Sequence, residues 1–293
     1  MSNVAIRLKD LKKTFDGKEY VVNGMNLEIP KGSLTAIIGF SGTGKSVMLK
    51  HILGIFRPTS GLIEVLDQDI TKMSNDQLTV FRRKFGVLFQ GAALFDDMSV
   101  LENVMFPLQE HRRELKLQKM QDIAIQKLKQ VGLDERHFNK LPSQISGGMQ
   151  KRTGLARALA LDPEIIFYDE PTTGLDPILT EMVDNLILET HKHRQGSSAT
   201  AATVSTSATG TASQSQLQLS PQLQQQLPAQ LPTQLPAMTS VMVSHDLDAA
   251  FRIADYVAML NAGQVLLFGT PEDFFKTDIE LVKKFVDKGM KRK

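Results

Sequence analysis

The chain has 293 residues, of which 42% are hydrophobic, enough for one large or two modest globular domains. Its 34 lysines and arginines nearly balance 32 aspartates and glutamates, and the net charge of +2 gives no strong overall field for nucleic acid or acidic membranes. The lack of cysteine excludes disulfides, thiol catalysis and cysteine-ligated metal. Neither a signal-peptide run in MSNVAIRLKD nor any stretch of about 18 apolar residues occurs, so we expect a soluble cytoplasmic protein.

Hydrophobic patterning predicts a mainly parallel α/β fold. Near the N-terminus, residues 5–8, 20–29 and 61–65 alternate apolar and polar side chains, which is typical of a small antiparallel sheet with one wet face. Apolar runs further along predict buried strands, and helical runs follow the first, third and fourth of them. These runs lie at residues 34–38, 86–89, 165–168 and 240–243.

Residues 91–142 have a helical pattern. We expect a helix over residues 100–105, a turn at Pro107 and Leu108, and a lysine-rich amphipathic helix over residues 115–131.

Two polar clusters are interpreted as solvated surface. Arg112 and Arg113 extend the basic face of the lysine-rich helix, a pattern that favours hydrated charge over a binding site. His191 and His193 have no cysteine or carboxylate cluster nearby in the sequence, which favours a solvated helix end over a metal site.

Residues 196–237 differ from the rest of the chain in composition. They consist mainly of Ser, Thr, Ala, Gln, Leu and Pro, without a charged or aromatic side chain. Ordering them would cost about 1–2 kcal/mol of backbone entropy per residue against little apolar area, so we predict disorder. A docking tether is one interpretation, and a tolerated low-complexity expansion is the favoured one, because lengthening a surface loop costs little closure entropy.

The stretch GFSGTGKS follows a predicted strand and precedes a predicted helix, the context that a phosphate-binding loop requires. Its glycines let backbone N–H groups converge on phosphate oxygens, and the dipole of the following helix favours negative charge. The lysine would reach the terminal phosphates and the last serine would ligate Mg²⁺. The loop consists of Gly39, Phe40, Ser41, Gly42, Thr43, Gly44, Lys45 and Ser46.

Asp169 and Glu170 end the apolar run IIFY. In a protein with a phosphate loop, Asp169 would hold Mg²⁺ through water and Glu170 would orient or deprotonate the attacking water. The alternative, an exposed acidic strand end, would be favoured if the phosphate loop were lacking.

The stretch ISGGMQKR places two glycines before a helix predicted over residues 149–161, although glycine in a helix costs about 1 kcal/mol relative to alanine. Ser146 is a candidate N-cap, and Gly147 and Gly148 leave the positive helix end bare for a phosphate. Since Lys45 already contacts the nucleotide in its own chain, this second phosphate-binding end is most useful to another copy. We therefore expect a head-to-tail homodimer with two shared nucleotides.

Together these motifs resemble the ATP-binding cassette (ABC) ATPases. They occur in that family's order: GFSGTGKS, Gln90 in VLFQ, ISGGMQ, IIFYDE, GLDP at residues 174–177, and His245 in VSHD. The resemblance spans nearly the whole chain outside residues 196–237, and it implies ATP and Mg²⁺ as the bound nucleotide and metal.

The resemblance also implies roles for single residues. Gln90 would sense Mg²⁺ and couple it to a membrane partner, and Ser146 and Gly148 would contact the γ-phosphate from the opposite subunit. Asp176 would bridge the dimer, while His245 would contact the γ-phosphate in its own subunit.

Phe15, in KTFDGK, occupies the position where the family stacks an aromatic ring on adenine. The alternative is a core phenylalanine of the small sheet.

The fold that the family implies is a P-loop NTPase with a RecA-like core, a small antiparallel β subdomain and an α-helical subdomain. We expect the core and the β subdomain in residues 1–90 and 158–293, and the helical subdomain with the signature in residues 91–157. Glu170 and His245 are 75 positions apart, and 33 without residues 196–237, close to the usual family spacing. The segment therefore belongs on a loop before the His245 strand.

Two positions depart from the family pattern. Val47 replaces the commoner threonine after the loop serine, which removes a hydroxyl from the α-phosphate. A hydrogen bond to a charged group is worth about 1.5–3 kcal/mol, so some nucleotide affinity would be lost unless backbone donors compensate. Met149 replaces the commoner glutamine of the signature.

A transporter's ATPase subunit is the favoured function. The alternative is a mechanical ATPase that acts on DNA or ribosomes. DNA-repair relatives carry long coiled coils between the phosphate loop and the signature, and translation-factor relatives carry two cassettes; this sequence has neither. Closing and opening of the dimer would drive a partner.

Residues 89–111, FQGAALFDDMSVLENVMFPLQEH, and the Val47 departure resemble the Mla (maintenance of lipid asymmetry) branch of the family. This resemblance implies phospholipid as cargo between inner and outer membranes, and a peripheral location on the cytoplasmic face of the bacterial inner membrane. Implied partners are a permease dimer (MlaE-like) that docks near residues 90–103, an MCE-domain substrate-binding protein (MlaD-like) and a STAS-domain regulator (MlaB-like), without nucleic acid. Alternative cargoes are another hydrophobic molecule or a polar solute.

Overall fold

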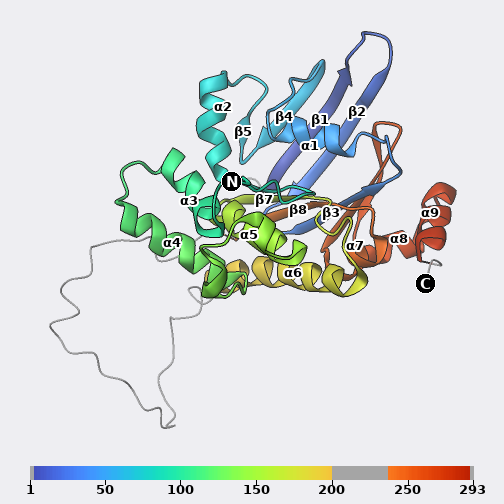
Figure 1. Ribbon diagram of the computed structural model, residues 1–293. Coiled ribbons are helices and arrows are strands. Elements are labelled where there is room, and N and C mark those ends of the chain that lie inside the picture. Colours follow the sequence, from blue (N-terminus) through green and yellow to red (C-terminus); the bar gives the residue numbers. More distant parts are fainter. Residues whose placement is uncertain (1–2, 200–236, 291–293) are drawn as a thin grey trace, which may run out of the picture.

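A computed structural model of the chain describes residues 3–199 and 237–290 (Figure 1). A four-stranded antiparallel sheet packs on one face of a six-stranded, mainly parallel sheet, and helices cover the other face. The predicted fold class, an α/β protein with a small antiparallel sheet, is confirmed by this arrangement.

The antiparallel sheet has the strand order β2-β1-β4-β5. Opposite residues on β1 and β2 include Ile6 with Ile29 and Leu8 with Leu27, so the apolar side chains of both strands share the inner face. The alternation read from the sequence is therefore correct, although β1 extends well beyond residues 5–8. The strands are β1 (Val4–Thr14), β2 (Tyr20–Pro30), β4 (Ser60–Val65) and β5 (Gln68–Asp69).

The larger sheet has the order β10-β9-β3-β8-β7-β6, and only β10 runs antiparallel to its neighbour among the described strands. Each strand predicted from an apolar run is present. The strands are β3 (Leu34–Gly39), β6 (Phe85–Leu88), β7 (Ile165–Asp169), β8 (Thr239–Val243), β9 (Tyr256–Asn261) and β10 (Gln264–Gly269).

Two hydrophobic cores lie on the two faces of this sheet. On β3, Leu34, Ala36 and Ile38 face the helical side, whereas Ile37 faces the antiparallel sheet and α1. Because both faces are covered, the strand is apolar throughout rather than alternating. The phosphate loop thus follows a strand that is buried on both sides.

The helices are α1 (Lys45–Ile52), α2 (Asn75–Phe81), α3 (Val100–His111), α4 (Leu117–Gln130), α5 (Gly147–Leu159), α6 (Pro177–Ala199), α7 (Leu247–Ile253), α8 (Pro271–Lys276) and α9 (Glu280–Met290). Short 3₁₀ turns occur at Arg82–Lys84, Glu135–His137 and Pro142–Gln144. Helices α3, α4 and α5 pack on one another at one end of the larger sheet (Figure 1).

The turn predicted at Pro107 and Leu108 is wrong, because Pro107 lies inside α3. A capping box between Ser99 and Glu102 sets the start of this helix. Beyond the proline the buried face continues through Leu108, and this packing stabilises the last turn although Pro107 lacks an N–H donor.

The solvated helix end predicted at His191 is also wrong. Its side chain is buried on α6 in line with Val183 and Ile187, and its Nδ1 lies 2.9 Å from the Ser240 hydroxyl on β8. The i, i+4 spacing continues the buried stripe of the helix to this position.

Helix α6 extends through Ala199, so the first four residues of the predicted disordered segment are helical. Residues 200–236 lie outside the described residues, and the prediction for them is not tested. The segment falls between α6 and β8, which is the loop before the His245 strand that was predicted.

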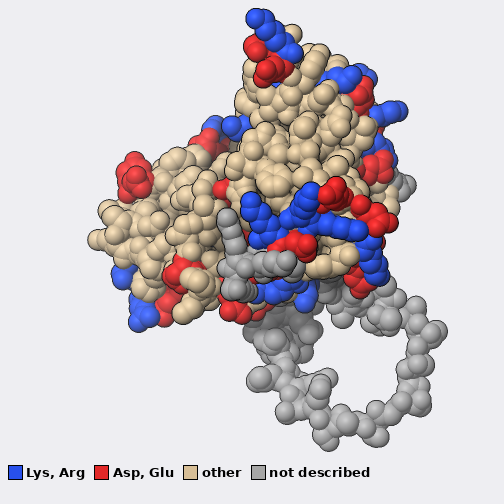
Figure 2. Space-filling model, turned by 90° about the vertical axis from the view of Figure 1, so that its right-hand side faces the viewer, with Lys and Arg blue, Asp and Glu red and all other residues tan. Residues whose placement is uncertain are grey.

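The described surface mixes both signs of charge. On the face shown in Figure 2, Lys and Arg side chains lie among Asp and Glu side chains rather than in one basic patch. Within residues 3–199 and 237–290, no helix combines the length and apolarity needed to cross a membrane.

Candidate functional site

The loop between β3 and α1 depends on its glycines. Gly39, Gly42 and Gly44 have φ of 146°, 78° and 97°, a region that side chains other than glycine rarely adopt. A Cβ on Gly39 would lie 2.4 Å from the Leu260 carbonyl oxygen, and one on Gly44 would lie 2.9 Å from that of Val21. The backbone can therefore pass this close to β9 and β2 only with glycine at these two positions.

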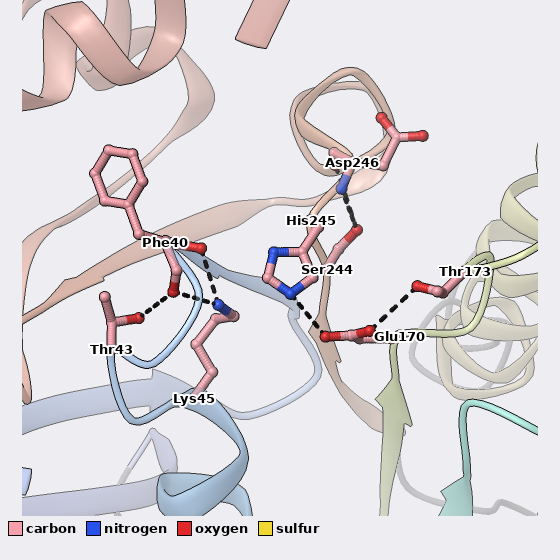
Figure 3. A network of polar contacts seen from close by, with 9 residues as sticks. Phe40, Thr43, Lys45, Glu170, Thr173, Ser244, His245 and Asp246 are labelled. Carbon is pink, nitrogen blue, oxygen red and sulfur yellow. Dashed lines mark hydrogen bonds and ion pairs between the residues drawn. The ribbon is translucent and has the colours of Figure 1, made fainter. Parts of the chain in front are cut away.

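The Phe40 carbonyl organises the inside of the loop. It accepts hydrogen bonds from Lys45 Nζ at 2.9 Å and from Thr43 Oγ1 at 2.8 Å, while the Gly39 carbonyl accepts a second one from Lys45 at 2.8 Å (Figure 3). Burial lowers the pKa of Lys45, and the nearby Glu170 charge opposes this shift. The ammonium group thus lies within the loop, at the start of α1.

A second group of side chains lies at the ends of β7 and β8. Glu170 has φ of 48°, and its N–H donates to the Val243 carbonyl at 2.9 Å. Its carboxylate lies 2.8 Å from His245 Nε2 and accepts from the Thr173 hydroxyl at 3.2 Å (Figure 3). Neighbouring parallel strands therefore bring the predicted base and the predicted histidine into direct contact.

The phosphate loop and this acidic group face one cavity of about 310 Å³. Its lining residues are Val21, Ser41, Gly42, Gly44, Lys45, Ser46, Val47, Glu170 and His245. Val21, on β2, and Thr173 were not predicted. Thr173 could have been found from its position three residues after Glu170. Val21 carries no sequence signal other than its place in a strand.

The three residues predicted to hold Mg²⁺ do not all line this cavity. Ser46 lines the cavity, but Asp169 and Gln90 do not. Burial and the Glu170 charge raise the pKa of Asp169, which is half-buried at the end of β7, while Lys50 opposes this rise. The Gln90 side chain is exposed, and its backbone carbonyl accepts a hydrogen bond from Lys151. Among the described residues, no cluster of three or more His, Cys, Asp or Glu side chains could hold a metal on its own.

The signature helix α5 begins at Gly147, two residues earlier than predicted, with Ser146 as its N-cap. The Ser146 hydroxyl accepts from the Met149 N–H at 3.4 Å. A Cβ on Gly147 would meet no atom within 4 Å, and one on Gly148 would lie 3.2 Å from Leu179. Ser146 and Gly147 are exposed, Gly148 is buried, and none of the three lines the cavity of its own chain.

Asp176 likewise stays away from the cavity. Its carboxylate accepts hydrogen bonds from the N–H groups of Ile178 and Leu179, both at 3.0 Å, and so caps α6.

Phe15 is 59% exposed, so the alternative of a core phenylalanine is wrong. The ring contacts Phe56 edge-on with centroids 5.5 Å apart, and Lys13 Nζ lies 5.0 Å from its centroid. It is available for stacking, and its adenine contact stays a prediction.

Comparison with known proteins decides the family. The ABC transporter family model matches residues 22–173, more than half of the chain. The chain belongs to this family. It is an ABC ATPase subunit that binds ATP and couples its hydrolysis to transport.

This ABC ATPase has relatives along nearly its whole length. It is 36% identical to the probable ribonucleotide transport ATP-binding protein mkl of Mycobacterium leprae, over 97% of this chain and 69% of that protein. It is 35% identical to the intermembrane phospholipid transport system ATP-binding protein MlaF of Haemophilus influenzae, over 97% of this chain and 90% of that protein. Its fold matches a dimeric post-hydrolysis state of the cassette MJ0796 bound to ADP and Pi, with a TM-score of 0.70 and 29% identity over 91% and 98% of the two chains.

Proposed function

We propose that this ABC ATPase powers a transporter that moves phospholipids between the inner and outer membranes and so maintains outer-membrane lipid asymmetry. The observation that carries the proposal is the match with the phospholipid transport protein MlaF, which extends over 90% of that protein and 97% of this chain. Residues 89–111 and Val47, which resemble the same branch, lie within the aligned length.

The alternative is a different cargo. The mycobacterial relative at 36% identity is described as a probable ribonucleotide transport protein, so a polar solute is the competing substrate class. The ATPase site would be common to both alternatives, because the cavity would contact nucleotide rather than cargo.

The cavity residues support a division of labour in hydrolysis. Lys45 would bind the terminal phosphates, because its ammonium group lies in the loop that the glycines form. Glu170 would orient the attacking water and accept its proton, and His245, 2.8 Å from it, would contact the γ-phosphate. Backbone N–H groups of residues 39–46 would hold the remaining phosphate oxygens.

The oxygen donors predicted for Mg²⁺ fit this ion chemically. Ser46 offers a hydroxyl, Gln90 an amide oxygen and Asp169 a carboxylate, and hard oxygen ligands are those that Mg²⁺ prefers. When bound, Mg²⁺ would neutralise phosphate charge. Burial and the Glu170 charge raise the pKa of Asp169, and a bound cation would oppose this rise by favouring the ionised carboxylate.

A homodimer would complete the site. Because Ser146 and Gly147 are exposed at a helix end outside their own cavity, we propose that they, together with the buried Gly148, contact the nucleotide bound to the other subunit. Asp176 would lie across the dimer interface. The match with a cassette described as dimeric supports this arrangement.

A permease would dock beside Gln90. A cavity of about 320 Å³ opens there, lined by Phe89, Phe95 and Phe106 together with Arg157. Phe89 and Phe95 are 43% and 38% exposed, and two such large apolar side chains beside a cavity are typical of an interaction site. We propose the MCE-domain and STAS-domain proteins as further partners. The proposed location is the cytoplasmic face of the inner membrane. For the domain organisation, we propose one part made of residues 1–90 and 158–293 and a second part made of residues 91–157.

Purification of the tagged full chain from native membranes tests the cargo. We expect a permease, an MCE-domain protein and a STAS-domain protein to co-purify, with phospholipid in excess over an unrelated membrane complex prepared in parallel. Glu170→Gln should retain the same partners, which controls for turnover. A complex that contains a solute-binding protein and no excess phospholipid would contradict the lipid proposal while leaving the ATPase assignment unchanged.

A further inference from the structure

The C-terminal helix α9 contacts the phosphate loop. The rings of Phe40, in the loop, and Phe285, on α9, pack edge-to-face with centroids 4.7 Å apart and an interplanar angle of 73°. Helix α9 lies more than 100 residues beyond the end of the family match at residue 173. The family motifs therefore do not account for this contact.

Phe40 is the residue through which a contact can act on Lys45. Its carbonyl accepts the hydrogen bonds of Lys45 and Thr43, whereas its ring points away from the Lys45 amine (Figure 3). Of the eight residues 39–46, it has the only aromatic side chain. Because residues 39, 42 and 44 are glycines, Phe40 is the only large apolar side chain of this loop, and its ring is 42% exposed.

Helix α9, which carries Phe285, is itself packed against the protein core. Val282 and Val286 are buried in the core of the helical side, with 0% and 5% exposure, and Phe285 packs against the same core. The helix also contacts α7, which begins at Leu247, two residues after His245. A cavity of about 410 Å³ lies between these parts, lined by Phe40, His245 and Phe285 among others. One helix thus borders both loops that face the nucleotide cavity.

We propose that Phe285 is a positioning residue of the nucleotide site, which holds the Phe40 peptide and thereby the Lys45 ammonium group in place. The inference rests on the proposed role of Lys45 in nucleotide binding. An edge-to-face aromatic pair is worth about two- to tenfold in an equilibrium constant. Loss of the pair should therefore weaken ATP binding by about that factor without removing any group that contacts the nucleotide.

A double-mutant cycle on the full chain tests the proposal. ATP affinity is measured with a slowly hydrolysed analogue, and kcat and KM with ATP, for Phe285→Ala, Phe40→Ala and the double variant. We expect each single variant to weaken binding about two- to tenfold, and the double variant to bind no more weakly than Phe40→Ala alone. Additive losses, or unchanged affinity in Phe285→Ala, would overturn the proposal.

Matched variants separate positioning from folding. Phe285→Tyr keeps the ring and should retain wild-type ATP affinity. Phe285→Leu keeps an apolar side chain that should preserve folding, but it lacks the ring and should bind ATP as weakly as Phe285→Ala. Lys284→Ala, on the exposed side of the same helix, should leave affinity unchanged. A Phe285→Ala chain with a lower melting temperature but wild-type affinity well below that temperature would show a merely structural role.

The underlying role of Lys45 is tested separately. Unchanged nucleotide binding in Lys45→Ala would refute that role and this inference with it. Loss of binding in Lys45→Ala, together with wild-type affinity in Phe285→Ala, would refute the role of Phe285 alone.

Discussion

Asp184 should make the stability of this ATPase depend on pH. Its side chain on α6 is 1% exposed, and it accepts a hydrogen bond from Arg252 on α7 at 2.7 Å through one oxygen. The other carboxylate oxygen has no hydrogen-bond partner among the described residues. Burial raises the pKa of Asp184 from 3.8 to about 6, although Arg252 favours the ionised form.

The sign follows from the raised pKa. The folded chain holds this proton more tightly than the unfolded chain, so the stability contributed by the protonated form is complete below about pH 4 and is lost as the pH rises through about 6. The full pKa shift corresponds to a loss of about 3 kcal/mol in the free energy of unfolding. About half of this loss occurs between pH 5 and pH 7.5.

Asp184→Asn removes this titration while keeping the shape of the side chain. We expect the free energy of unfolding of the wild type, relative to the variant, to fall by about 1.4 kcal/mol from pH 5 to pH 7.5. Reversible urea unfolding followed by circular dichroism at both pH values measures this difference. Asp278→Asn, at a fully exposed carboxylate, is the control. Equal differences between wild type and Asp184→Asn at both pH values would refute the reasoning.

Glu170→Gln should bind ATP, accumulate as a closed dimer and lose about 10²–10⁴-fold in turnover; unchanged steady-state hydrolysis would exclude it as the base. Mixing Ser146→Arg chains with Lys45→Ala chains should restore partial turnover, because mixed dimers hold one intact composite site; no recovery on mixing would argue against a shared site if one intact site suffices. Gly39→Ala should cost about 1–3 kcal/mol, seen as a lower melting temperature, since its φ of 146° and the Leu260 carbonyl oppose a Cβ. Replacing residues 200–236 by a short Gly-Ser linker should leave the melting temperature and ATPase activity nearly unchanged, and a large drop in either would indicate that the segment packs on the fold.

Much of the candidate nucleotide site can be proposed from the sequence because its chemistry is local. Residues 39–46 supply the glycines, the lysine and the hydroxyl within one short loop, and the flanking apolar patterns identify the strand and helix around it. The N-cap at Ser146 is equally local, since a cap depends on the next few residues. Errors arose where distant packing overrides such patterns. Pro107 stays helical and His191 is buried because neighbouring elements cover them.

Which residues meet across the cavity could not be read from spacing along the chain. Glu170 and His245 are 75 positions apart, yet they lie 2.8 Å from each other because β7 and β8 are parallel neighbours and end at the same edge. The Phe40 and Phe285 rings meet for a similar reason, since burial of Val282 and Val286 brings α9 to the phosphate loop. Local chemistry is encoded by residues close together in the sequence, which stay near one another even before the chain folds. Contacts between distant residues depend on strand order and core packing, which belong to the folded chain as a whole.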